Sequence, residues 1–140
     1  MLQNNGFIRL AADLQSDSIV DGPGLRTVIW TQGCSHNCPG CQNPTTHDFN
    51  GGGLVELELV KEAIDELEYQ TGITFSGGDP MFQPYACNEL AEYCKNKGYN
   101  IWVYMPMLQN EVPSFQVYHK HRCSLHLDFS LRSYHFRDIL

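Results

Sequence analysis

The amino-acid sequence predicts an α/β fold with parallel strands, and the order of two kinds of segment predicts it. Short runs rich in β-branched and aromatic residues, at residues 27–30, 73–76 and 99–105, are typical of strands. Two longer segments between them, at residues 54–70 and 84–97, have the spacing of amphipathic helices. Strands that alternate with helices form parallel sheets with right-handed crossovers, so we expect the three strands in one parallel sheet.

The two predicted helices are supported by their patterning and by their ends. Residues 54–70 carry an acidic face, typical of a solvated helix surface. The apolar positions at helical spacing are Leu57, Val60, Ile64 and Leu67. Residues 84–97 have proline in the first turn and Gly98 where a C-terminal cap is expected. Cys87 and Cys94 lie on one face of this second helix, and we expect both to be small buried residues.

Length, charge and composition limit the classes of function. The chain has 140 residues, enough for about one domain, and its formal net charge of −7 argues against a partner bound through nucleic-acid phosphates. No run approaches the ~18 apolar residues of a membrane span, and the first residues lack a signal-peptide pattern. We therefore expect a cytoplasmic protein with no membrane and no nucleic-acid partner. Residues 1–104 are predicted to form the core, and residues 105–140 a divergent or disordered tail.

Three of the six cysteines lie directly after the first predicted strand. Cys34, Cys38 and Cys41 are so close in sequence that they are poor candidates for disulfide bonds with one another. In a reducing compartment, clustered cysteines indicate metal or redox chemistry. A double-glycine turn at residues 77–80 follows the second predicted strand. The carboxyl ends of parallel strands meet at one rim, so we expect the cysteine loop and this turn to lie on the same rim.

Two kinds of metal centre are compatible with three cysteines. A zinc site needs a fourth ligand, for which His36 or His47 is available, although an exposed loop position is the simpler expectation for His36. Further candidates lie near the end of the chain: His119, His121, Cys123 and His126. A four-iron cluster has one outside ligand per iron, so three thiolates leave one iron open to a substrate. The cluster explains the cysteine count better, because a second Cys-x-x-Cys pair is absent.

The spacing Cys-x-x-x-Cys-x-x-Cys at the end of a first strand resembles the signature of the radical S-adenosylmethionine enzymes. This resemblance implies a 4Fe-4S cluster on Cys34, Cys38 and Cys41, with the amino and carboxylate groups of S-adenosylmethionine on the open iron. It also implies a partial, truncated (β/α) barrel of the radical S-adenosylmethionine type, because the family's further strand and helix units are not recognisable after residue 104.

Residues 76–80, Ser-Gly-Gly-Asp-Pro, resemble the second motif of this superfamily, which holds the methionyl ammonium of the cosubstrate. The resemblance implies that Gly77 and Gly78 permit close backbone approach and that Asp79 supplies a carboxylate. An ordinary turn is the simpler interpretation of these residues alone, and their place after the second strand favours the motif.

The residue before the third cysteine bears on how the adenine of the cosubstrate would be held. Many members of the superfamily carry an aromatic residue there, beside the adenine. This chain has Gly40, so the resemblance implies that the adenine contacts come from the backbone around Gly40, Cys41 and Gln42.

Residues 18–49 resemble the activating enzymes that install a glycyl radical on a partner protein, most of all those of anaerobic ribonucleoside-triphosphate reductase. Asp21 and Arg26 belong to their leading motif, and we expect them either to face the partner's glycine loop or to form a turn and a surface ion pair. The resemblance implies that an electron donor such as flavodoxin reduces the cluster and that S-adenosylmethionine is cleaved. The adenosyl radical then takes a hydrogen from a glycine Cα of the reductase.

Two alternative functions stay open. The chain could activate another glycyl-radical enzyme, such as pyruvate formate-lyase, with the same site residues. It could instead be an inactive, truncated iron–sulfur binding remnant, because residues 105–140 depart from the family pattern.

Overall fold

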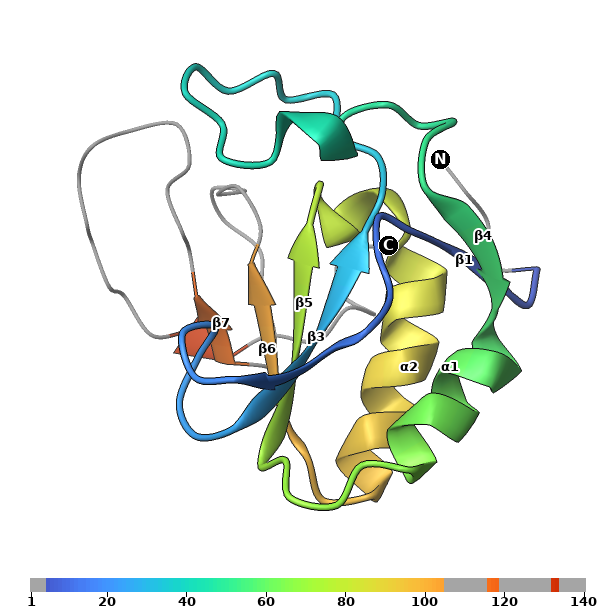
Figure 1. The fold of residues 1–140 in the computed structure, drawn as a ribbon, viewed down its shortest axis with the longest axis vertical. Helices are drawn as coiled ribbons and strands as arrows, with labels where there is room; N and C mark the ends of the chain where they lie inside the picture. Colours follow the sequence, from blue (N-terminus) through green and yellow to red (C-terminus); the bar gives the residue numbers. More distant parts are fainter. Residues whose placement is uncertain (1–4, 105–115, 119–131, 134–140) are drawn as a thin grey trace.

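Three parallel strands form the centre of the fold, as the sequence predicts. The computed structural model describes residues 5–104, 116–118 and 132–133. Strand β3 (Arg26–Thr31) pairs in parallel with β5 (Gly72–Gly77), which pairs in parallel with β6 (Asn100–Tyr104). All three point toward the same edge in Figure 1. The central residues of all three strands are buried, as is typical of parallel strands whose two faces are covered by other parts of the protein.

The two predicted helices are the crossovers between these strands. Helix α1 (Leu57–Asp65) joins β3 to β5, and α2 (Pro84–Asn96) joins β5 to β6. Figure 1 shows them side by side against the sheet. They bury one apolar stripe each, which forms a single core with the strands. The buried helical residues are Leu57, Val60, Ile64, Ala86, Cys87, Leu90, Ala91 and Cys94.

Three short strands that the sequence analysis did not predict make the sheet mixed. Strand β1 (Phe7–Leu10) pairs antiparallel with β4 (Gly53–Glu56) and with the end of β3. Strand β2 (Gln15–Ser18) pairs antiparallel with β3. Because Leu54 to Glu56 belong to β4, helix α1 begins three residues later than predicted, and it ends at Asp65 rather than near residue 70.

The α/β class is confirmed, while the closure of the sheet into a barrel stays a prediction. The strand order is β4-β1-β3-β5-β6-β7-β8, with β2 attached to β3. Strand β7 (Gln116–Tyr118) is parallel to β6, and β8 (Arg132–Ser133) is antiparallel to β7. The proposed division at residue 104 also stays a prediction. In the part of the chain that the structure describes, neither helix has the length and apolar character needed to cross a membrane.

The Arg26 side chain is buried and hydrogen-bonds to the neighbouring parallel strands. The prediction that Arg26 forms a surface ion pair is therefore wrong. The side chain is 1% exposed. The guanidinium donates hydrogen bonds to the Thr74 hydroxyl (2.7 Å), the Ile73 carbonyl (2.9 Å) and the Asn100 carbonyl (3.0 Å). It also donates to the Pro23 carbonyl at 3.0 Å. These bonds join β3, β5, β6 and the turn before β3, which leaves Arg26 no surface to offer a partner protein.

Cys87 and Cys94 are buried in α2, as predicted, and burial changes their chemistry. Both are 0% exposed. Burial in an apolar layer disfavours the thiolate, so it raises the pKa of Cys94 to about 12 and raises the pKa of Cys87 as well. Both thiols therefore stay neutral in the folded protein over the ordinary pH range.

We expect the stability of the protein to fall as the pH rises above about 9. The ordinary thiol pKa is 9.0, so the unfolded chain loses these protons first, while the folded chain keeps them until about pH 12. Between these values each thiol lowers the free energy of unfolding by up to about 1.4 kcal/mol per pH unit. Urea unfolding from pH 8 to pH 10 measures this slope.

The matched comparison is the double variant Cys87→Ala, Cys94→Ala. Other titrating groups are common to both proteins, so the difference between the two slopes isolates the thiols. The double variant should lose stability less steeply with pH, whatever its stability at pH 8. Parallel curves would contradict the assignment of raised thiol pKa values.

Candidate metal centre

The cysteine loop and the double-glycine turn lie on the same rim, as the topology predicts. The loop leaves the end of β3, and the turn leaves the end of β5 (Figure 1). The two strands stay paired to their last residues, Thr31 and Gly77. Beyond them the Gly78 N–H donates to the Thr31 carbonyl (2.9 Å), and the Asp79 N–H donates to the Gly33 carbonyl (3.2 Å). The start of the cysteine loop is therefore bonded directly to the turn.

The two glycines of the turn allow this close contact between backbones. A Cβ on Gly77 would lie 2.3 Å from the Thr31 carbonyl oxygen, and Gly77 has a positive φ of 107°. A Cβ on Gly78 would lie 2.5 Å from the Gly33 carbonyl oxygen. Any other residue would push the turn away from the loop. This structural reason for the glycines was not predicted, because the sequence analysis considered only approach by a cosubstrate.

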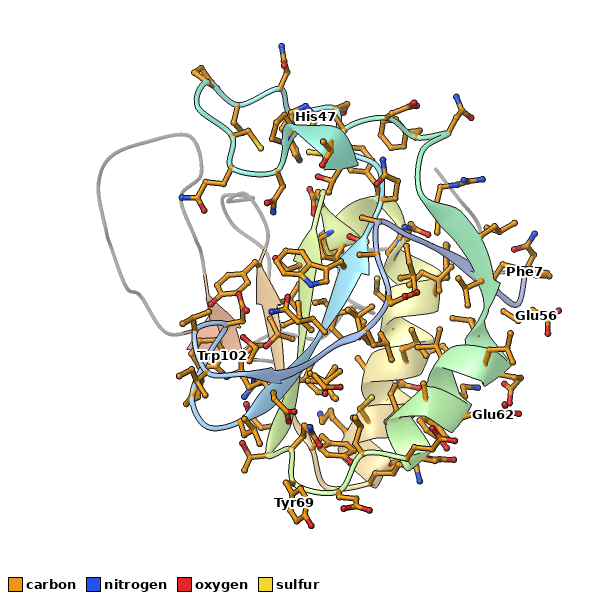
Figure 2. All side chains as sticks on the ribbon, in the orientation of Figure 1. Phe7, His47, Glu56, Glu62, Tyr69 and Trp102 are labelled. Carbon is orange, nitrogen blue, oxygen red and sulfur yellow. The ribbon has the colours of Figure 1, made fainter. Side chains whose placement is uncertain are left out.

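A short 3-10 helix, η1 (Pro44–Thr46), closes the other side of the loop. The Gly33 N–H donates to the Thr46 carbonyl (2.8 Å), and the Cys34 N–H donates to the His47 carbonyl (3.2 Å). The His47 ring nitrogen Nε2 lies 3.3 Å from the Cys41 sulfur. Figure 2 shows His47 on this segment, above the strand ends. One residue thus contacts two of the predicted cluster ligands.

Two buried glutamines hold the base of the loop, and sequence reasoning missed both. The Gln32 amide donates to the Thr45 carbonyl (3.1 Å) and the Asp48 carbonyl (2.7 Å). The Gln83 amide donates to the Gln32 carbonyl (3.1 Å), and it also exchanges two hydrogen bonds with the backbone of Arg9 in β1. Buried amides of this kind satisfy loop carbonyls that water cannot reach. They also keep the loop in one conformation.

The three predicted ligands differ in state. Cys34 and Cys41 are half-buried and form no disulfide bond. Cys38 is also half-buried, and it is disulfide-bonded, so its sulfur becomes a ligand only after reduction. The Cys41 N–H donates to the Cys38 carbonyl (3.1 Å), which makes the tight turn that the two-residue spacing requires. Gly40 adopts a positive φ of 71° within that turn.

The described residues form no ready site for a single metal ion. Among the described residues, no three Cys, His, Asp or Glu side chains lie close enough to bind one metal ion. A tetrahedral zinc with bonds of about 2.3 Å would need its sulfurs about 3.8 Å apart. A cubane binds each thiolate at a different iron, so it accepts more widely spaced sulfurs. The other predicted zinc ligands, His119, His121, Cys123 and His126, lie outside the described residues.

Asp79 is buried beneath the loop and is held from two sides. Its carboxylate oxygen Oδ1 accepts the Met81 N–H (2.9 Å), and Oδ2 lies 2.6 Å from His36 Nε2. The Asp79 side chain is 6% exposed and the His36 side chain 35% exposed. The expected exposed loop position of His36 is confirmed. The sequence analysis missed its contact with Asp79.

The residues predicted to hold the adenine are accessible. Gly40 and Gln42 are exposed, and Cys41 between them is half-buried. A Cβ on Gly40 would meet nothing within 4 Å, so open space surrounds this part of the loop. The side chain of Asn43 reaches back to the Gly77 carbonyl at 3.5 Å, which joins the end of this segment to the turn. All the predicted cofactor-binding residues therefore belong to two connected segments of one rim.

The model of the 4Fe-4S single cluster domain family matches residues 20–131. The chain belongs to this family. It shares 33% identity over 107 residues with the anaerobic ribonucleoside-triphosphate reductase-activating protein of Salmonella typhi, covering 71% of this chain and 70% of the relative. It shares 42% identity over 65 residues with the protein of the same name from Enterobacteria phage T4, covering 45% and 42%.

The pyruvate formate-lyase-activating enzyme of Clostridium pasteurianum is similar as well, with 39% identity over 90 residues. The match covers 61% of this chain but only 38% of that relative, so the chain spans well under half of its length. The predicted resemblance to the radical S-adenosylmethionine superfamily, in its glycyl-radical-activating branch, is confirmed, and so are the cofactors that it implies: a 4Fe-4S cluster and S-adenosylmethionine.

We expect Gly78→Ala to separate the turn from the cysteine loop. Its Cβ would lie 2.5 Å from the Gly33 carbonyl oxygen and 3.0 Å from that of Thr46, and neither backbone can move freely. Overpacking of this kind costs about 1–3 kcal/mol. Urea unfolding should show that loss, and iron bound after anaerobic reconstitution should fall. Gly53→Ala is the control, because a Cβ there meets nothing within 4 Å. Equal behaviour of the two variants would contradict the predicted clash.

Proposed function

We propose that this protein is the activating enzyme of an anaerobic ribonucleoside-triphosphate reductase and that it generates a glycyl radical on that partner. The observation that carries the proposal is the direct bonding of a three-cysteine loop to a Gly-Gly-Asp-Pro turn at the carboxyl ends of β3 and β5. Cys34, Cys38 and Cys41 would hold the cluster. When bound, the cluster and S-adenosylmethionine supply an electron and a carbon-centred radical that removes hydrogen from a glycine Cα.

The polarity of the turn supports a cationic ligand group. The N–H groups of Gly78, Asp79 and Met81 all donate within the protein. A glycine loop that binds phosphate presents such N–H groups to the ligand instead. Here the turn offers the Asp79 carboxylate, which attracts an ammonium rather than an anion. We infer that Asp79 receives the amino group of S-adenosylmethionine, with Gly77 and Gly78 lining its path.

The exposed side of the loop would serve the rest of the cosubstrate. Open space surrounds Gly40, and Gln42 is exposed, so backbone carbonyl groups of this segment can bond to the edge of an adenine. The Cys41 N–H already donates to the Cys38 carbonyl. No catalytic side chain is assigned among the loop residues. The role of the chain is to bind and orient the cosubstrate and to exclude water from the reacting atoms.

The reductase is the preferred partner because of the extent of the similarity. The chain covers 70% of the Salmonella typhi reductase-activating protein and 38% of the pyruvate formate-lyase-activating enzyme. We also infer a cytoplasmic location and an electron donor such as flavodoxin. For the fold we infer a partial, truncated (β/α) barrel, with residues 1–104 as its core and residues 105–140 as a divergent or disordered tail. The 39% identity with the second relative keeps pyruvate formate-lyase as the alternative partner.

Removal of the predicted ligands should abolish cluster binding. After anaerobic reduction and reconstitution with iron and sulfide, we expect Cys34→Ala, Cys38→Ala and Cys41→Ala each to lose most bound iron and the visible absorption of the cluster. Cys94→Ala is the matched control, because that thiol is buried in α2. Full iron content in the three loop variants would contradict the assignment.

Cleavage of the cosubstrate and transfer of the radical test the function itself. The reconstituted wild-type protein, given dithionite and S-adenosylmethionine, should form 5′-deoxyadenosine. Addition of the anaerobic reductase should produce a glycyl-radical signal by electron spin resonance, larger than the signal with pyruvate formate-lyase. The opposite preference favours the alternative partner. Absence of 5′-deoxyadenosine from cluster-loaded protein favours an inactive iron–sulfur remnant.

A further inference from the structure

His36 connects the two segments of the site through a single side-chain contact. It lies within the cysteine loop, between Cys34 and Cys38, and its Nε2 atom is 2.6 Å from Asp79 Oδ2. Forty-three positions separate the two residues in the sequence. An ionised carboxylate only accepts hydrogen bonds, so the ring N–H is the donor. A charge-assisted bond of this length is among the stronger side-chain interactions.

The His36 ring is held in place by aromatic packing. Its centroid lies 5.5 Å from that of Phe82, in η2 (Pro80–Phe82), directly after the turn. Phe82 packs edge-on against Phe49 at 5.2 Å, and Phe49 follows η1. Aromatic contacts of this kind are favourable beyond the area that they bury. The His36 ring, 35% exposed, is thus restrained by a tilted aromatic contact and by its contact with Asp79.

Donors on both oxygens of Asp79 restrain how its carboxylate is turned. Met81 N–H holds Oδ1 from within the turn, and His36 holds Oδ2 from the loop. A carboxylate has about four lone-pair sites, and these two donors occupy one on each oxygen. Without His36 the carboxylate loses the contact that joins Oδ2 to the cysteine loop, which weakens the restraint on its side-chain torsions. Binding an ammonium then costs the entropy of ordering it.

We propose that His36 is a positioning residue that orients the Asp79 carboxylate for the ammonium of S-adenosylmethionine. The proposal rests on the proposed function, in which Asp79 receives that group. The affinity for S-adenosylmethionine would then depend on His36, which lies in the cysteine loop but is not a cluster ligand. Loss of residues that orient metal ligands typically weakens metal binding 10- to 100-fold, and we expect a loss of the same order for the ammonium contact of Asp79.

The experiment uses three variants, reconstituted anaerobically and compared with the wild type. His36→Phe keeps an aromatic ring against Phe82 but removes the donor. His36→Gln keeps an N–H donor of similar reach and serves as the rescue variant. Phe82→Leu keeps the donor and removes the aromatic partner. Bound iron and sulfide, the Kd for S-adenosylmethionine by equilibrium dialysis, and kcat and KM for its cleavage are measured for each.

We expect His36→Phe to raise the Kd and KM for S-adenosylmethionine at least tenfold, with unchanged iron content and kcat within about twofold. His36→Gln should recover most of the affinity. In an Asp79→Asn background, His36→Phe should add little further loss, because the two residues act as a unit. Phe82→Leu should weaken binding less than His36→Phe does.

Three outcomes overturn the proposal. A wild-type Kd in His36→Phe shows that the contact does not matter for the cosubstrate. Loss of iron in both His36→Phe and His36→Gln assigns His36 to loop folding instead. Additive losses in the Asp79→Asn background show that it acts elsewhere. Failure of the cluster-loaded wild type to bind S-adenosylmethionine overturns the proposed function as well, and this result is distinct from the other three.

Discussion

The parallel pairing of β3 with β5, continued beyond the ends of both strands, is the constraint on which the rest of the site depends. Inside the sheet the two strands exchange the regular bonds of a parallel ladder. Beyond Gly77 the alignment continues as two further backbone bonds: the Gly78 N–H donates to Thr31, the last residue of β3, and the Asp79 N–H donates to Gly33 at the start of the cysteine loop. Two motifs that are distant in sequence are therefore fixed relative to each other by main-chain geometry, before any ligand is bound.

This pairing explains why the rim is suited to a positively charged group. The N–H groups of Gly78 and Asp79 already donate to β3 and to the cysteine loop. The polar groups that the turn can offer to a ligand are therefore carbonyl and carboxylate oxygens. The Asp79 carboxylate is almost buried, and both of its oxygens have a partner within hydrogen-bond distance. Buried Arg26 has the corresponding role at the other end of β3, where its guanidinium satisfies carbonyls of β5 and β6. The start of β3 is thus held by the Arg26 guanidinium, and its end by backbone hydrogen bonds to the turn after β5.

Local patterns predicted the parallel core and the place of both motifs, because strand and helix periodicities are encoded in consecutive residues. The prediction failed where the signal was short or distant. Strand β2, Gln-Ser-Asp-Ser, has no apolar alternation, and β4 follows glycines and was assigned to the helix after it. Sequence analysis also missed the contact of His36 with Asp79 and the hydrogen bonds that Gln32 and Gln83 donate to loop carbonyls. These polar contacts join residues that are distant in sequence, so no periodic pattern of consecutive residues encodes them.

The position of β7 has a practical consequence for how the protein can be shortened. Strand β7 continues the sheet beyond β6, so the outer backbone groups of β6 are already paired. A chain cut after Tyr104 would leave that edge open, with its N–H and C=O groups free to recruit a strand from another molecule. Such a fragment would retain every residue assigned to the rim and would still self-associate. The low solubility of this fragment, rather than the loss of site residues, would limit experiments with it.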